Sequence, residues 1–162
     1  MRLKDKVAIV TGSGRNIGEE TVKLFVSEGA KVAVVDLDES LGKAVADALN
    51  ATRAGSAIYI KANVADEESV KKMIAETVAA FGRIDILVNN VAISDNLTIR
   101  ECSKADFDKT IGVTLGSQFL TCKWVGEQMI TQGDGGAIIN IGSTSGFQGR
   151  ETAIAYAAAK GG

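Results

Sequence analysis

Short apolar runs rich in Val, Ile and Ala recur along the chain, and longer segments with helical spacing separate them. Four of the runs are continuous rather than alternating, which is typical of strands buried on both faces of a parallel sheet. We therefore predict five strands. They are Val7–Val10, Val32–Val35, Ala57–Ile60, Ile86–Asn89 and Ala137–Ile141.

The intervening segments carry the signals of helix starts and ends. The clearest is Asp66–Phe81, because Asp66 can cap its first turn, apolar residues form one stripe along it, and Gly82 follows as a terminator. We predict Ser103–Ile130 as one long helix and Gly133–Gly136 as a tight turn into the next strand. The other predicted helices are Ile17–Glu28, Glu39–Arg53 and a last one that begins at Thr152 and reaches Lys160.

Strands and helices alternate, which predicts an α/β fold: a Rossmann-type doubly wound parallel sheet with helices on both faces. No linker, repeat or low-complexity tract divides residues 1–162, so we predict a single dinucleotide-binding domain. The last helix has barely begun when the sequence ends. We therefore expect a C-terminally truncated domain whose fifth strand is an uncovered edge.

Composition and charge exclude several classes of function. The net charge of -2 gives no attraction to nucleic acid, and no apolar run is long enough to span a membrane, so a cytoplasmic protein is expected. Cys102 and Cys122 are predicted to be reduced thiols. There is no histidine, which removes the usual zinc ligand sets and Ser–His catalysis. We predict no metal site, and acid–base chemistry is left to Tyr, Lys, Asp, Glu or water.

A glycine-rich turn, Thr11–Gly18, follows the first strand and opens the first helix. At this place in a βαβ unit, free N–H groups of the helix and close backbone approach favour a dinucleotide pyrophosphate. A glycine turn without a ligand is the alternative. The cofactor contacts predicted here are Gly12, Ser13, Arg15, Asn16, Ile17 and Gly18.

Asp36 ends the second strand, where a carboxylate can accept hydrogen bonds from the adenosine ribose hydroxyls. It would repel a 2′-phosphate and so favours NAD, and the neighbouring Leu37 is assigned to the same site. Arg15 argues for NADP, since a guanidinium can pair with that phosphate. We predict NAD, with NADP as the less favoured cofactor.

The turn resembles the Thr-Gly-x-x-x-Gly-x-Gly motif of the short-chain dehydrogenase/reductase family, and the resemblance runs along the whole chain. Asn16 stands at the middle glycine, where Asn tolerates a left-handed backbone. Asn89–Asn90 resembles the first half of the family's Asn-Asn-Ala-Gly. The resemblance implies that Asn90 lies near the adenosine and holds the central strands together. It also implies that Asn63 and Val64 meet the adenine ring.

The most specific feature is Tyr156 and Lys160, one helical turn apart on the same face, with Ser143 preceding them. A neighbouring ammonium favours the phenolate of a tyrosine, which can then exchange a proton with an alcohol or carbonyl oxygen while hydride moves to or from nicotinamide. The resemblance implies that Ser143 bonds the same substrate oxygen and that Tyr156 and Lys160 also contact the cofactor.

One position departs from the family. Thr114 occupies the place of an Asn that holds a proton-relay water, so we include Thr114 in the catalytic set and expect slower turnover or help from a neighbouring group. Three readings stay open: an oxidoreductase acting on an alcohol or carbonyl, a dinucleotide-binding module without turnover, and a scaffold that binds no cofactor.

The substrate class is left open by the sequence. Five residues near the strand ends are candidates for its pocket: Ile93, Ser94, Phe147, Gln148 and Arg150. A small-molecule alcohol or carbonyl partner is expected. A homo-oligomer, either dimer or tetramer, is also expected, because the long predicted helix carries enough apolar surface to need a partner or the sheet, and the resemblance implies that this helix pairs with its symmetry mate.

Overall fold

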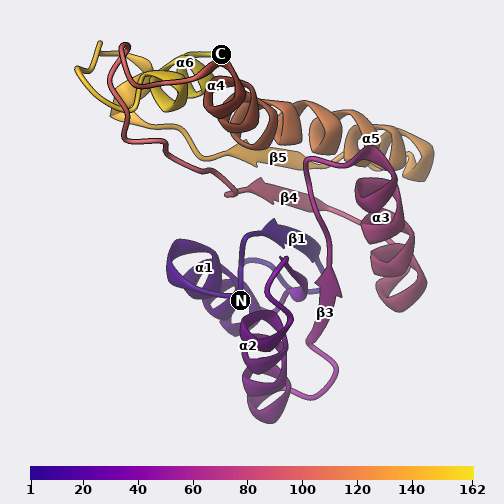
Figure 1. Ribbon diagram of the computed structural model, residues 1–162. Coiled ribbons are helices and arrows are strands. Elements are labelled where there is room, and N and C mark those ends of the chain that lie inside the picture. Colours follow the sequence, from indigo (N-terminus) through magenta and orange to yellow (C-terminus); the bar gives the residue numbers. More distant parts are fainter.

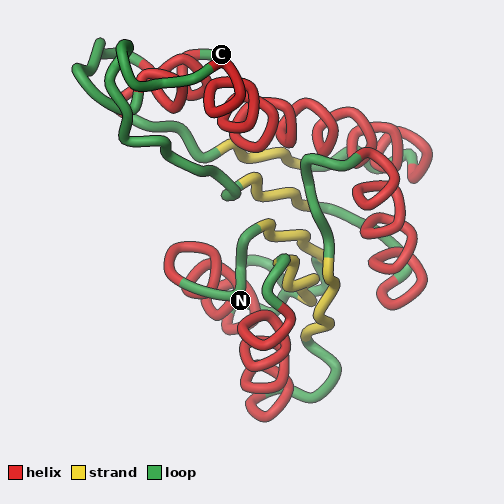
Figure 2. Tube along the Cα trace, viewed as in Figure 1, coloured by secondary structure: helices red, strands yellow, loops and turns green.

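The predicted strands form one parallel sheet in the computed structural model, which describes residues 1–162. The strand order is β3-β2-β1-β4-β5, and every neighbouring pair is parallel (Figures 1 and 2). The sequence prediction of five strands is confirmed, although the fifth ends before Ile141. The bounds are β1 Val7–Thr11, β2 Lys31–Asp36, β3 Ala57–Lys61, β4 Ile86–Asn89 and β5 Ala137–Asn140.

Successive residues of the central strands enter two separate cores, one on each face of the sheet. Ala8 and Val10 of β1 pack with Val22 and Val26 on one face. Ile9, between them in the sequence, packs with the other core. Because side chains of a strand point alternately to opposite faces, a continuous apolar run places apolar side chains in both cores.

The chain forms six α-helices. They are α1 Asn16–Ser27, α2 Glu39–Thr52, α3 Glu67–Phe81, α4 Lys104–Ile111, α5 Ser117–Gln132 and α6 Ile154–Gly161. Helices α1 and α2 supply the first core, and α3 and α5 supply the second (Figure 1). The expected cap of α3 is confirmed, since the Asp66 side chain accepts a hydrogen bond from the Ser69 N–H and Gly82 ends the helix with a φ of 83°. The doubly wound α/β fold is therefore confirmed.

The long predicted helix is not one regular helix. A π-helical segment, Gly112–Gly116, separates α4 from α5, so the prediction of a single α-helix over Ser103–Ile130 is wrong in this detail. The side chain of Ser103 caps the start, and Gly133 ends α5 with a φ of 83°. A π-helical turn adds a residue to the helical repeat, which shifts the faces of α4 and α5 relative to each other.

The fifth strand differs from the central strands, which are buried on both faces. All four residues of β5 are exposed, with Ile138 at 38% and Ile139 at 41%. The physical reason is that no residue of β5 belongs to either buried core, and that β5, at the edge of the sheet, has only β4 beside it. The expectation of an uncovered edge strand is thereby confirmed.

Asp85, just before β4, links three strands at the amino-terminal end of the sheet. Its carboxylate accepts hydrogen bonds from the Val7 N–H at 2.9 Å and from the Arg83 guanidinium at 2.7 Å, and Lys6 lies within 3.4 Å. Its carbonyl accepts from the Ala137 N–H. Burial on its own would raise the pKa of Asp85, but these hydrogen bonds and the two cations hold it below its usual value.

None of the helices combines the length and apolar character that crossing a lipid bilayer requires.

Candidate active site

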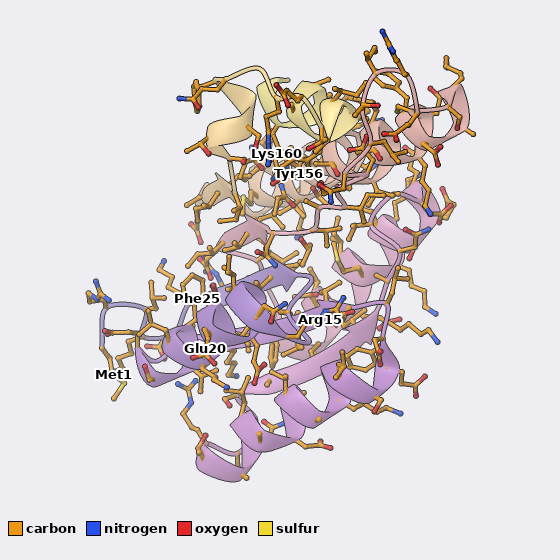
Figure 3. All side chains as sticks on the ribbon, turned by 60° about the vertical axis from the view of Figure 1, so that its left-hand side comes forward. Met1, Arg15, Glu20, Phe25, Tyr156 and Lys160 are labelled. Carbon is orange, nitrogen blue, oxygen red and sulfur yellow. The ribbon has the colours of Figure 1, made fainter.

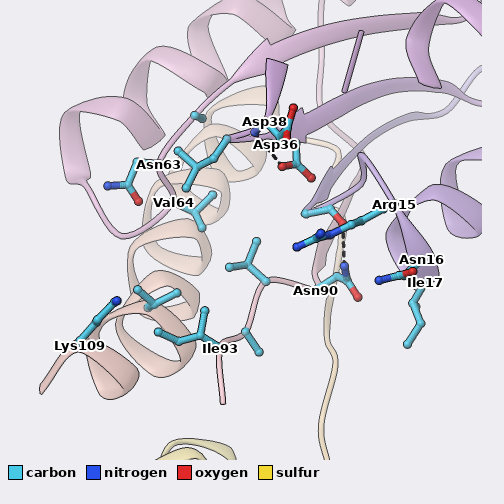
Figure 4. A pocket seen from close by; sticks show the side chains of 16 residues that line it. Arg15, Asn16, Ile17, Asp36, Asp38, Asn63, Val64, Asn90, Ile93 and Lys109 are labelled. Atoms are coloured by element: carbon cyan, nitrogen blue, oxygen red, sulfur yellow. Dashed lines mark hydrogen bonds between the residues drawn. The ribbon is translucent and has the colours of Figure 1, made fainter. Parts of the chain in front are cut away.

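A cleft of about 610 Å³ opens at the carboxyl ends of the strands, where ligands of such sheets bind. Its walls come from the turn after β1, the end of β2 and the loops after β3 and β4 (Figure 4). Most of the predicted cofactor residues line it. These are Gly12, Arg15, Asn16, Ile17, Asp36, Leu37, Asn63, Val64 and Asn90.

The glycine turn takes the backbone shape that the sequence predicts. Asn16 has a left-handed φ of 53° and Gly12 a φ of 63°. A Cβ on Gly18 would lie 2.2 Å from the Gly12 carbonyl oxygen, so only glycine allows α1 to start this close to the turn. The buried Ser13 hydroxyl donates to the Val10 carbonyl and accepts from the Val35 N–H. Gly18 and the Ser13 side chain therefore shape the turn and do not line the cleft.

Helix α1 begins at this turn without a side-chain cap. Helices α2, α3 and α4 differ, because side chains of Asp38, Asp66 and Ser103 accept hydrogen bonds from their first-turn N–H groups. The first N–H groups of α1 are thus left for another acceptor, and an anion is favoured there by the helix dipole.

Asp36 is held at the cleft by two backbone N–H groups. Its Oδ2 accepts from the Gly14 N–H at 2.9 Å, and its Oδ1 accepts from the Asp38 N–H at 3.0 Å. Each of these hydrogen bonds needs an oxygen that accepts, and a carboxylate offers two such oxygens. Arg15 extends along the same cleft from the glycine turn (Figure 4). The carboxylate and the guanidinium that the sequence analysis weighed against each other therefore line one cleft.

Asn90 joins β4 to the glycine turn. Its Nδ2 donates to the carbonyls of Thr11 and Gly12, at 3.2 and 3.0 Å, and its N–H donates to the Thr11 hydroxyl. The expected role of Asn90 in holding the central strands together is confirmed by these bonds. On the opposite side of the cleft, the Asn63 side chain accepts from the Ala65 N–H, and Val64 is buried.

Tyr156 and Lys160 lie next to each other on α6, with Lys160 Nζ 5.9 Å from the centre of the tyrosine ring (Figure 3). Lys160 Nζ also donates to the Ile141 carbonyl, which ties α6 to the end of β5. Ser143 lies two residues beyond Ile141, and its Oγ accepts from the Ser145 N–H at 3.2 Å. The structure thus brings Lys160 to both Tyr156 and the segment that carries Ser143, beyond the residues that line the cleft.

Thr114 is fully buried within the π-helical segment. Its hydroxyl accepts from the Ile93 N–H and donates to the Ile93 carbonyl, both at 3.1 Å. This pair of bonds fastens the loop after β4 to the helix. The hydroxyl therefore holds the protein backbone at the cleft, because Ile93 is one of the lining residues.

Several lining residues were missed by the sequence analysis. Lys109 of α4 and Val113 of the π-helical segment reach the cleft from the helical side. Which helix face points to the cleft depends on the π turn, and a regular helical repeat does not predict that turn. Ile93 was assigned to the substrate but lines this cleft with Val91 and Ala92, and their position directly after Asn90 was the available signal. Among the other substrate candidates, Phe147 is 92% exposed and the Arg150 guanidinium donates to the Ser145 hydroxyl.

Comparison with known proteins identifies relatives over the whole chain. A family model described as short chain dehydrogenase matches residues 6–162. A short chain dehydrogenase/reductase of Aspergillus oryzae is 42% identical over 161 residues, which are 99% of this chain and 62% of that protein. A D-threitol dehydrogenase of Mycolicibacterium smegmatis is 37% identical and matches 98% of this chain and 60% of that protein.

A third relative, the 2,5-dichloro-2,5-cyclohexadiene-1,4-diol dehydrogenase of Sphingobium indicum, is 38% identical over 98% of this chain and 62% of its own length. Among solved structures, a short chain dehydrogenase from Mycobacterium avium superposes with a TM-score of 0.93 at 32% identity, covering all of this chain and 60% of that one. The chain thus spans about 62% of the length of the curated relatives it matches first.

Proposed function

Because the chain belongs to the short-chain dehydrogenase family, we propose that it binds a nicotinamide dinucleotide in the carboxyl-end cleft and serves hydride transfer between that cofactor and a small alcohol or carbonyl compound. The observation that carries the proposal is the joint lining of one cleft by the glycine turn, Asp36 and Asn90. The printed names of two relatives, dehydrogenases of D-threitol and of a cyclic diol, support alcohols as the substrate class.

The residues present fit a dinucleotide. A side chain at Gly12 would narrow the cleft, since its Cβ would lie 3.1 Å from Val91 Cγ2, and a Cβ on Gly14 would lie 2.9 Å from Asp36 Oδ2 and crowd that carboxylate. The uncapped start of α1 offers N–H groups to the pyrophosphate. Asn63 and Val64 would contact the adenine from the loop after β3.

NAD is the cofactor we propose over NADP. Asp36 has no side-chain cation as a hydrogen-bond partner in the fold, only the two backbone N–H groups described above. Its negative charge would therefore meet a 2′-phosphate directly, whereas ribose hydroxyls can donate to it. Arg15 is solvent-exposed, so screening weakens its attraction for a phosphate.

When bound, the nicotinamide supplies or accepts the hydride. Tyr156 moves the proton at the substrate oxygen, and the Lys160 ammonium lies beside its ring, 5.9 Å from the ring centre. Ser143 donates a hydrogen bond to the same oxygen. Thr114 holds the backbone of Ile93, which lines the cleft. A dinucleotide-binding module without turnover is the second candidate. Both hydrogen bonds of the Thr114 hydroxyl are made to the Ile93 backbone, so this hydroxyl does not take over the water-holding role of the family's Asn.

The test is calorimetric titration of the chain with NADH and, separately, with NADPH. Saturable binding of NADH that is at least tenfold tighter than binding of NADPH is expected, and an Asp36→Ala variant should bring the two affinities together. Binding of neither nucleotide would overturn the proposal, and tighter binding of NADPH would overturn the cofactor assignment.

A homo-oligomer is also part of the proposal. Exposed apolar side chains gather along α4 and α5, with Phe119 at 64% and Ile130 at 76% exposure. Such side chains favour pairing with a second copy of the chain. Sedimentation-velocity analysis over a tenfold range of protein concentration tests this, and a purely monomeric protein would contradict it.

A further inference from the structure

Tyr59 of β3 makes a hydrogen bond that is not part of the strand pairing. Its hydroxyl donates to the main-chain carbonyl of Asp36 at 3.1 Å. Within the ladder, Tyr59 pairs with Val34 and Asp36 pairs with Lys61. The side chain of Tyr59 therefore reaches along the sheet to the last residue of β2, the residue whose carboxylate lines the cleft.

The tyrosine ring is fixed by the backbone of α2. A Cβ on Gly42 would lie 2.2 Å from Cε2 of Tyr59, so α2 packs directly against the ring at its only interior glycine. Burial raises the pKa of Tyr59, and the carboxylates of Glu39, Asp36 and Asp38 raise it further. The hydroxyl consequently stays protonated and remains a donor at neutral pH.

Asp36 is thus anchored at both ends of the residue. Tyr59 holds its carbonyl, and the N–H groups of Gly14 and Asp38 hold its carboxylate. A side chain that is already oriented loses less conformational freedom when a ligand binds, so anchoring raises affinity without adding a contact. We infer that Tyr59 is a positioning residue for the cofactor, acting through Asp36 on the adenosine ribose. The inference rests on the proposed function.

The variant Tyr59→Phe tests it, because phenylalanine keeps the ring under Gly42 and removes only the hydroxyl. We expect NADH and AMP to bind about threefold to tenfold more weakly, the range that one neutral hydrogen bond supports. Binding of nicotinamide mononucleotide, which lacks the adenosine, should not change. The variant should weaken the binding of NADPH less than the binding of NADH. In NADPH the 2′-phosphate replaces a ribose hydroxyl that would donate to Asp36, so less affinity depends on the position of that carboxylate.

Two controls separate positioning from a general effect on the fold. Thr52→Val removes a hydroxyl from α2 that donates to the Leu49 carbonyl, away from Asp36, and should leave all affinities unchanged. In an Asp36→Ala background, Tyr59→Phe should produce no further loss of NADH affinity, since the carboxylate it positions is gone.

An equal loss in both backgrounds, or no loss in either, overturns the inference and leaves the proposed function standing. Failure of the wild-type chain to bind NADH overturns both.

Discussion

At the scale of single residues, the glycine turn depends on backbone conformation at one non-glycine position. Asn16 adopts a φ of 53° where the family motif has glycine. Asn reaches this region at lower cost than other side chains, which is why the substitution preserves the turn. Residue type alone was enough to predict this, because the conformational preference of Asn is a local property.

Tyr156 carries a prediction at the same scale. The variant Tyr156→Phe removes the hydroxyl that exchanges the substrate proton and keeps the ring against Lys160, so turnover should fall about 100- to 10,000-fold while NADH binding stays nearly intact. The measurement is NADH formation with a panel of polyols and cyclic diols, next to a calorimetric titration. A variant that keeps most of the wild-type rate would exclude Tyr156 as the acid–base group.

At the scale of the elements, the π-helical segment matters because it buries Thr114 against the loop after β4. Thr114→Val keeps the volume of the side chain but leaves the N–H and the carbonyl of Ile93 without this partner. We expect a loss of about 1–3 kcal/mol in the free energy of unfolding, together with faster hydrogen exchange at the Ile93 amide.

The matched control for Thr114 is Thr131→Val, which removes an exposed hydroxyl that donates to the Glu127 carbonyl on α5. It should change the free energy of unfolding by less than about 0.5 kcal/mol. Equal stability of the two variants in urea titrations would show that the bonds to Ile93 contribute nothing.

The elements also show which features a sequence can predict. The start of α3 at Asp66 and its end at Gly82 follow from short-range chemistry, and both were predicted correctly. The π turn and the exposure of Ile139 depend on what packs against them from elsewhere in the fold. The approach of Lys109 to the cleft was missed for the same reason, whereas lining residues of the glycine turn, together with Asp36 and Asn90, were found.

At the scale of the whole molecule, Asp85 makes stability depend on pH. Its pKa is below the usual value in the folded protein, so its contribution is complete above the unfolded pKa of about 3.9 and is lost as the pH falls through the folded value. Asp85→Asn should lower the free energy of unfolding at pH 7 by about 1.5–3 kcal/mol, since it removes the charged acceptor shared by the Val7 N–H and the Arg83 guanidinium.

Urea titrations between pH 7 and pH 3 check this, and the difference between Asp85→Asn and wild type should shrink towards the acid end. The control is Asp134→Asn, which removes the other, 63% exposed carboxylate that pairs with Arg83 and should cost less than about 1 kcal/mol. If the difference in unfolding free energy between Asp85→Asn and wild type did not change with pH, the assigned role of Asp85 would be contradicted.

The cleft also brings together parts of the fold that lie far apart in the sequence. Its walls include the turns after β1 and β2 on one side and Lys109 and Val113 on the other. With the proposed dinucleotide seated there, a free concentration of one hundred times Kd would add about 2.7 kcal/mol to the free energy of unfolding. Since proteases act on the opened chain, the nucleotide supply of the cell would then set how long each copy of the protein survives.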